Sequence, residues 1–166
     1  SWSYWTSFAQ EKWGQKNRFY LLRMNTQGDN NNESYGDIQN GGTITDNSNL
    51  WVLGNYSRFI RPGAVRMAIT ATDKSGQIVP EGDTNQKGLM CSAYRNTNGQ
   101  WVMVVINYAD QEQECTLRVN DPKVKSWQGY RTSDTPGEDL LPIKKLNKKQ
   151  LAVIPARSVT TFVSEN

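Results

Sequence analysis

The spacing of apolar residues along the chain changes abruptly at Pro62 and Gly63. Residues 46–60 (DNSNLWVLGNYSRFI), just before them, combine three possible N-cap residues with apolar positions spread widely around a helix. Pro62 lacks a backbone donor and Gly63 permits a sharp turn, so we expect the helix to end there. Residues 64–71 (AVRMAITA), just after them, have alternating apolar positions, which predicts a strand.

Short segments with strand-like alternation then follow to the end of the chain. Residues 88–96 and 100–109 flank the turn sequence TNG, which predicts a β-hairpin. No second helical pattern occurs among them. We therefore predict a mainly β fold, an antiparallel β-sandwich of about 7–9 strands. The further segments expected to form strands are 113–119, 124–133, a short stretch near Leu140, 151–155 and 158–163.

The segment before the sandwich is of a different kind. Residues 1–8 (SWSYWTSF) alternate and predict a strand, and residues 18–24 form a second short extended run. Residues 25–42 are rich in Asn and Gly, and a loop of this length within a domain is usually functional or mobile. A strand, a long loop and a helix cannot bury their own faces. The predicted division is therefore residues 1–61, as a remnant of a larger body, and residues 62–166, as the β-sandwich.

Composition removes several classes of site. The chain of 166 residues has 19 basic and 16 acidic side chains, a net charge of +3 and no histidine. Nucleophile arrangements of the Ser-His-Asp and Cys-His types therefore lack a base, and most zinc and copper sites lose their usual ligands. We expect no metal and no cofactor. Cys91 and Cys115 are left either as a disulfide or as separate buried thiols.

The charge balance and the lengths of the apolar runs bear on partners. A net charge of +3 does not by itself predict nucleic-acid binding, and we expect no nucleic-acid partner. No apolar run approaches the roughly 18–20 residues needed to span a bilayer, so no membrane span is expected.

Four local patterns have both a functional and a structural interpretation. Residues 29–37 (DNNNESYGD) carry oxygen ligands at alternate positions, but Ser34 stands where a calcium loop needs glycine, which favours a solvated loop. Residues 143–150 (IKKLNKKQ) could bind an acidic polysaccharide or a phosphate backbone, or form a solvated turn. The triplets at 32–34 and 55–57 fit the N-glycosylation sequon, and the second lies in the predicted helix.

Aromatic residues on the predicted sandwich form a fourth pattern. Trp127 together with Tyr130 could form a platform on which a sugar stacks, as in a carbohydrate-binding module. Alternatively, these rings and that of Trp101 pack between the sheets or against another domain, which is the interpretation that the sequence favours.

Several of these segments carry a family resemblance. Residues 53–67 (LGNYSRFIRPGAVRM) resemble the segment that joins the last barrel helix to the side β-domain in glycoside hydrolase family 30. Residues 92–119 are similar to the central hairpin of that β-domain and its next strand, and residues 154–163 to its closing strand. Residues 1–5 (SWSYW) stand where the eighth barrel strand is expected. The resemblance spans nearly the whole chain.

The resemblance implies that the chain is the C-terminal part of a retaining glycoside hydrolase that combines a (β/α)8 barrel with a β-sandwich. The family's two catalytic carboxylates would lie upstream of Ser1, so no catalytic residue is assigned here and the chain alone is expected to be inactive. Trp5 matches a tryptophan that lines the family's sugar site. The implied partners are a β-linked polysaccharide or oligosaccharide, of galactan, xylan or glucan type, and the rest of the barrel. The implied location is secreted, periplasmic or on the cell surface.

Two other functions remain open from the sequence. A stand-alone carbohydrate-binding β-sandwich module would bind polysaccharide without the upstream segment. A purely structural interaction domain would show no affinity for sugars.

Overall fold

The computed structural model describes residues 7–10, 20–26, 42–72, 75–79 and 88–165. Trp2, Tyr4 and Trp5 lie outside these residues. The chain divides into two compact units, Ser1–Trp51 and Val52–Asn166. In the part that is described, no helix is long and apolar enough to cross a membrane.

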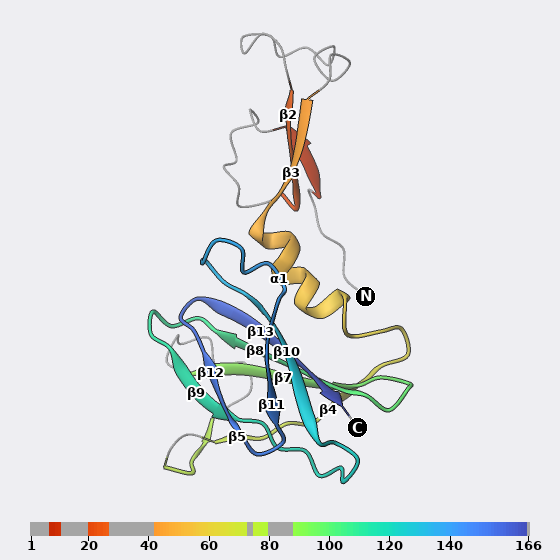
Figure 1. The fold of residues 1–166 in the computed structure, drawn as a ribbon, viewed down its shortest axis with the longest axis vertical. Helices are drawn as coiled ribbons and strands as arrows, with labels where there is room; N and C mark the ends of the chain where they lie inside the picture. The colour runs from red at the N-terminus through yellow and green to blue at the C-terminus, as the bar shows by residue number, and fades with distance from the viewer. Residues whose placement is uncertain (1–6, 11–19, 27–41, 73–74, 80–87, 166) are drawn as a thin grey trace. The chain divides into compact units, whose positions relative to one another are not determined.

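The first unit contains a three-stranded sheet in the order β1-β2-β3 (Figure 1). Its strands are β1 (Phe8–Gln10), β2 (Leu22–Thr26) and β3 (Gly42–Asp46). β1 pairs with β2 in parallel and β2 with β3 in antiparallel orientation. The expectation of a loop over residues 25–42 is wrong at both ends, because Asn25 pairs with Thr43 and Thr26 with Gly42. Cross-strand pairing there overrides the low strand propensity of Asn and Gly.

Helix α1 (Ser48–Ser57) crosses the division between the units and confirms the predicted helix. Asn47 is its N-cap, since its Oδ1 atom accepts a hydrogen bond of 3.2 Å from the backbone N–H of Asn49. After Ser57 the backbone continues in turns, with the N–H of Ile60 donating to the carbonyl of Tyr56. The helix thus ends before Pro62, as the sequence predicts.

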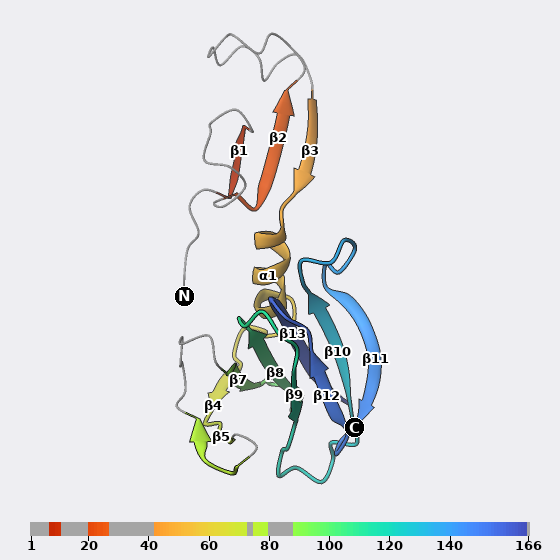
Figure 2. The ribbon, with the colours of Figure 1, turned by 90° about the vertical axis from the view of Figure 1, so that its left-hand side faces the viewer.

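The second unit is built on a six-stranded antiparallel sheet with the order β11-β10-β13-β8-β7-β4 (Figures 1 and 2). A two-stranded sheet, β12-β9, faces it, and β5 and β6 form a further pair. The β5–β6 pair was not predicted as a hairpin, because its strands are only two residues long. The bounds are β4 Val65–Met67, β5 Ala71–Thr72, β6 Ile78–Val79, β7 Leu89–Arg95, β8 Trp101–Asn107, β9 Gln113–Thr116, β10 Ser126–Thr132, β11 Leu141–Asn147, β12 Leu151–Ile154 and β13 Ser158–Glu165.

Both faces of the six-stranded sheet are covered. One face packs on the β12-β9 sheet through a core that includes Trp127, Phe162 and Ile154. The other face presents Val102, Val104 and Val159, which pack against the end of α1 and the turn that follows it. Side chains alternate between the faces of a strand, so β8 supplies residues to both cores and is almost entirely buried. The predicted fold class, mainly β with an antiparallel β-sandwich after a helix, is confirmed.

Candidate functional site

Asn55, whose side chain is fully buried, ties α1 to the sheet. Its Nδ2 atom donates to Thr132 Oγ1 at 2.9 Å, and Thr161 Oγ1 lies 2.8 Å from the Asn55 carbonyl and 2.9 Å from its Oδ1 atom. A buried amide is costly unless it is paired, and here it finds partners on two strands. Asn55 also opens the sequon at 55–57, and its burial leaves the amide inaccessible to a glycosyl donor.

The joint between helix and sandwich, residues 58–64, is pinned to the β7–β8 turn by Asn96. Its Nδ2 atom donates to the Phe59 carbonyl at 2.9 Å, and its Oδ1 atom accepts from the backbone N–H of Arg61 at 3.1 Å. Gly63 has a φ of +85°, and a Cβ atom there would lie 2.8 Å from Thr97 Cγ2. The joint is therefore a fixed corner of the second unit rather than a free linker.

A third buried asparagine, Asn107, holds the loops at the end of β8. The two N–H bonds of its Nδ2 atom are shared among the carbonyls of Gln111, Ile154 and Pro155, at 2.8, 3.0 and 2.9 Å. Its Oδ1 atom accepts from the backbone N–H of Ala109 at 3.1 Å. Sequence reasoning missed all three asparagines as structural residues. Only the position of Asn55 in a predicted helix, and of Asn96 at a predicted turn, could have indicated them.

The aromatic platform that the sequence left open as the alternative for Trp127 and Tyr130 is not formed. The two residues are three apart on β10, so their side chains leave opposite faces of the sheet. Trp127 is 1% exposed in the core between the sheets, where no sugar can reach its ring. Tyr130 lies on the helix-facing side, with its ring centroid 4.5 Å from that of Phe59 and the guanidinium of Arg58 5.8 Å away.

The other aromatic residues that the sequence singled out lie elsewhere. Trp101 is half-buried, its Nε1 atom donates to Asp121 at 2.9 Å, and the guanidinium of Arg95 lies over its ring. Packing, which the sequence favoured for these rings, describes Trp101 and Trp127. The sugar-contacting role that the resemblance implies for Trp5 falls on a residue outside the described part.

Three carboxyl groups have lowered pKa values because they accept hydrogen bonds that stabilise the fold. Burial alone would raise the pKa of Glu138, but hydrogen bonds from Arg131 and Ser133 outweigh it and lower the pKa. Hydrogen bonds from Lys145 and Ser126 lower the pKa of Glu165. The Trp101 indole and the backbone N–H of Lys123 do the same for Asp121. A general acid of a glycosidase needs a raised pKa, so these three groups are unsuited to that role.

The two cysteines are free thiols on β7 and β9. Both pack against the core between the sheets. Burial raises the pKa of Cys91 to about 11, and burial together with the nearby Cys91 raises that of Cys115 to about 12. The structure therefore has two separate, half-buried thiols rather than the disulfide, and both are poor nucleophiles at neutral pH. The described residues contain no group of three or more His, Cys, Asp or Glu placed to hold a metal ion.

Comparison with known proteins gives these features a family. Residues 63–162 match the model of the glycosyl hydrolase family 30 beta sandwich domain. A GH30 endoxylanase from Clostridium papyrosolvens C71 is 26% identical over 74% of this chain and 28% of its own, with a TM-score of 0.56. A conserved exported protein from Bacteroides fragilis is 26% identical over 87% of this chain and 26% of its own, with a TM-score of 0.64.

A further solved structure shares the fold. The catalytic domain of GH30 xylanase C from Talaromyces cellulolyticus is 22% identical over 89% of this chain and 27% of its own, with a TM-score of 0.57. The chain thus spans between 26% and 28% of the length of these solved structures. With the family model covering more than half of its residues, the chain belongs to glycosyl hydrolase family 30 and contains the β-sandwich domain of that family.

Proposed function

We propose that this chain is the C-terminal portion of a secreted, retaining glycoside hydrolase that acts on a β-linked polysaccharide. In this proposal residues 1–61 supply the last strand, loop and helix of a (β/α)8 barrel, and the β-sandwich supports that barrel. The observation that carries it is the fixed joint, where Asn96 and Gly63 hold the end of α1 on a domain of the family 30 type.

The lengths of the matched proteins support the same proposal. This chain corresponds to little more than a quarter of the endoxylanase and of the exported protein. The catalytic carboxylates of a retaining enzyme stand about 5 Å apart, and we place them in the part of the barrel not contained in this chain. The name of the endoxylanase makes xylan the first substrate to test, with galactan and glucan next. The exported neighbour supports secretion.

Hydrolysis assays with two proteins test the proposal. The 166-residue chain and a longer form that includes the upstream barrel are incubated with xylan, galactan and β-glucan, and released reducing ends are measured. We expect release only from the longer form, with retention of the anomeric configuration by NMR. In the longer form, Trp5→Ala should lower kcat/KM if this ring contacts the sugar. Hydrolysis by the isolated chain would overturn the proposal.

The alternative function, a stand-alone module that stacks sugars on aromatic rings, is not supported by the positions of Trp127 and Tyr130. Trp127 is buried and Tyr130 is stacked on Phe59. Any affinity of the sandwich for a polysaccharide needs a different surface.

A further inference from the structure

Six lysines gather at one end of the β10–β11 pair. The backbone brings their segments together, since the N–H of Lys148 donates to the carbonyl of Lys125 at 3.0 Å and Ser126 pairs with Asn147. We call this group the lysine surface; its members are Lys123, Lys125, Lys144, Lys145, Lys148 and Lys149. Five of the six are exposed, and Lys148 is half-buried.

A bulge in β11 explains why two consecutive lysines point outward. Trp127 pairs with Leu146 and Gly129 with Ile143, so Lys144 and Lys145 together lie opposite the single residue between Trp127 and Gly129. Ile143 and Leu146 both pack against the core. A regular strand would turn one of the two lysines inward, whereas the bulge leaves both in solvent.

Few of these charges are neutralised within the domain. Lys145 forms an ion pair of 2.6 Å with Glu165, and Lys148 donates to the backbone carbonyl of Asp121. Lys125, Lys144 and Lys149 form no ion pair with any residue in the described ranges.

Among the described residues, the two acidic residues that contact these lysines have other partners as well. Glu165 accepts from Ser126 Oγ at 2.9 Å, and Asp121 accepts from Trp101 Nε1 and from the backbone N–H of Lys123. In the described part of the chain, six lysines thus lie beside two carboxylates that already have hydrogen-bond partners, although the whole chain has a net charge of only +3.

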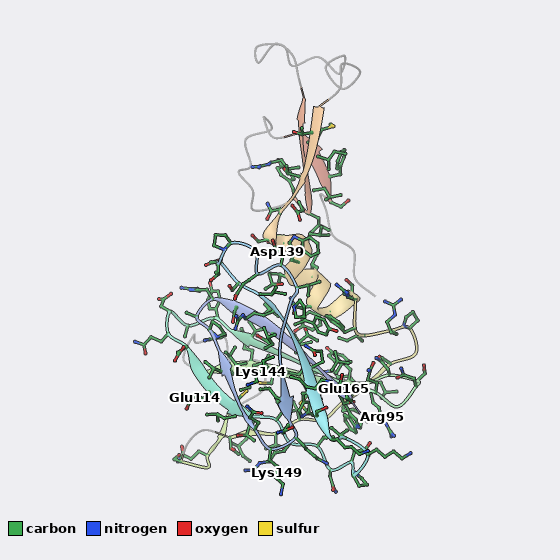
Figure 3. All side chains as sticks on the ribbon, in the orientation of Figure 1. Arg95, Glu114, Asp139, Lys144, Lys149 and Glu165 are labelled. Carbon is green, nitrogen blue, oxygen red and sulfur yellow. The ribbon has the colours of Figure 1, made fainter. Side chains whose placement is uncertain are left out.

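Acidic residues lie at the other end of the same strand pair. Asp134, Glu138 and Asp139 belong to the loop between β10 and β11, and Figure 3 shows Asp139 and Lys149 at opposite ends of the sandwich. The excess positive charge is therefore local. A polyanion would therefore be attracted more strongly to the lysine end of the domain than to the end that carries Asp134 and Asp139.

We propose that the lysine surface binds a polysaccharide that carries carboxylate groups. Lysine ammonium groups are strong point charges for carboxylates, and a charged polymer can contact several of them at once. A nucleic acid is less suited, because the two described tryptophans beside this surface offer no free ring for base stacking: Trp101 is covered by Arg95 and Trp127 is buried. The choice of a polysaccharide rests on the proposed function, but the charged surface does not.

Affinity electrophoresis of the 166-residue chain in gels containing polygalacturonate tests this binding, with neutral β-glucan as the matched polymer. We expect retardation in polygalacturonate alone, and its loss at about 0.5 M NaCl, where charges are strongly screened. The double variant Lys144→Gln/Lys149→Gln should bind about tenfold more weakly, because each exposed ion pair contributes up to about 1 kcal/mol. Lys144→Arg/Lys149→Arg keeps both charges and should retain the affinity.

A charge-matched control separates a local surface from overall charge. Gln111→Glu/Thr135→Glu lowers the net charge by the same amount at exposed positions near the acidic end, and should bind nearly as the unchanged chain does. Equal losses in this control and in the Lys→Gln variant would overturn the proposal, as would no retardation or stronger binding to single-stranded DNA of similar charge density. None of these outcomes depends on hydrolysis, so the binding test and the proposed function can fail separately.

Discussion

Three buried asparagines connect parts of the second unit that hydrophobic burial alone would not position. Asn55 connects the helix to β10 and β13, Asn96 connects the joint to the β7–β8 turn, and Asn107 connects β8 to the loops beside it. Each amide both donates and accepts, so each specifies one orientation of its partners. Removing one side of such a network leaves buried polar groups unpaired, which costs more than an average hydrogen bond contributes.

Asn55→Ala should lower the free energy of unfolding by about 2–3 kcal/mol, because it removes the buried side-chain bonds to Thr132 and Thr161 and leaves a cavity where the amide was. Urea denaturation followed by tryptophan fluorescence measures this loss. Ser57→Ala, at an exposed position, also destroys the sequon and should change stability by less than about 0.5 kcal/mol. Equal losses in the two variants would contradict the role given to Asn55.

Glu138 should make the domain sensitive to acid. Its folded pKa is lowered, so the stability it contributes is full above the unfolded value of about 4.3 and is lost as the pH falls below it. Thermal melts between pH 7 and pH 3 should show a steeper acid loss in the unchanged chain than in Glu138→Gln. Parallel pH profiles would show that the bonds from Arg131 and Ser133 do not stabilise the folded state.

At the level of elements, the joint and the bulge decide how the chain is arranged around the six-stranded sheet. The helix covers one face because the joint turns back sharply at Gly63, whose φ is +85°. The bulge in β11 keeps Ile143 and Leu146 in the core across a change of register. Pro62 and Gly63 make the joint readable from sequence, whereas a bulge depends on pairing between strands and has no comparable local signal.

Gly63 in the joint and Gly99 in the β7–β8 turn have the same backbone conformation. Comparing them separates the cost of backbone strain from the cost of a steric clash. Gly63→Ala and Gly99→Ala both place a side chain at a φ near +85°, which costs about 1 kcal/mol. Only at residue 63 does the new Cβ atom meet a neighbour, Thr97 Cγ2 at 2.8 Å, while nothing lies within 4 Å at residue 99. We expect Gly63→Ala to be the more destabilising of the two by about 1–2 kcal/mol in chemical denaturation. Equal effects would mean that the joint can shift without cost.

For the whole molecule, the sequence predicted the β-sandwich, the helix before it and the family, because these depend on local periodicity and on a specific joint. The possible sugar-stacking platform of Trp127 and Tyr130 rested on their closeness in sequence. Because side chains alternate between the two faces of a strand, residues three apart on β10 lie on opposite faces instead. Sequence reasoning also missed the pairing of Thr26 with Gly42, which depends on contact between segments far apart in sequence.

The reactivity of the two thiols depends on whether the β-sandwich is folded. Because burial raises the pKa values of Cys91 and Cys115 to about 11 and about 12, both should react slowly with a disulfide reagent at pH 8 and rapidly once the domain unfolds. The raised folded values also mean that stability is full below the unfolded pKa of about 8.5 and decreases as the pH rises above it. Stopped-flow reaction with Ellman's reagent and melts from pH 8 to 11 measure both effects. Fast labelling of the folded chain would contradict the burial.

Val102, Val104 and Val159 are covered by side chains from the end of α1 and from the turn after it. This cover determines where the domain can be cut and joined to another protein. A chimera joined at residue 62 would separate this sheet face from Tyr56, Phe59 and Ile60, and would replace Asn55 with whatever the donor helix supplies. A chimera joined before residue 52 would carry the helical cover along with the sheet. We expect the second kind of graft to yield soluble protein more often, so the heritable module in this family would include the end of the helix as well as the sandwich.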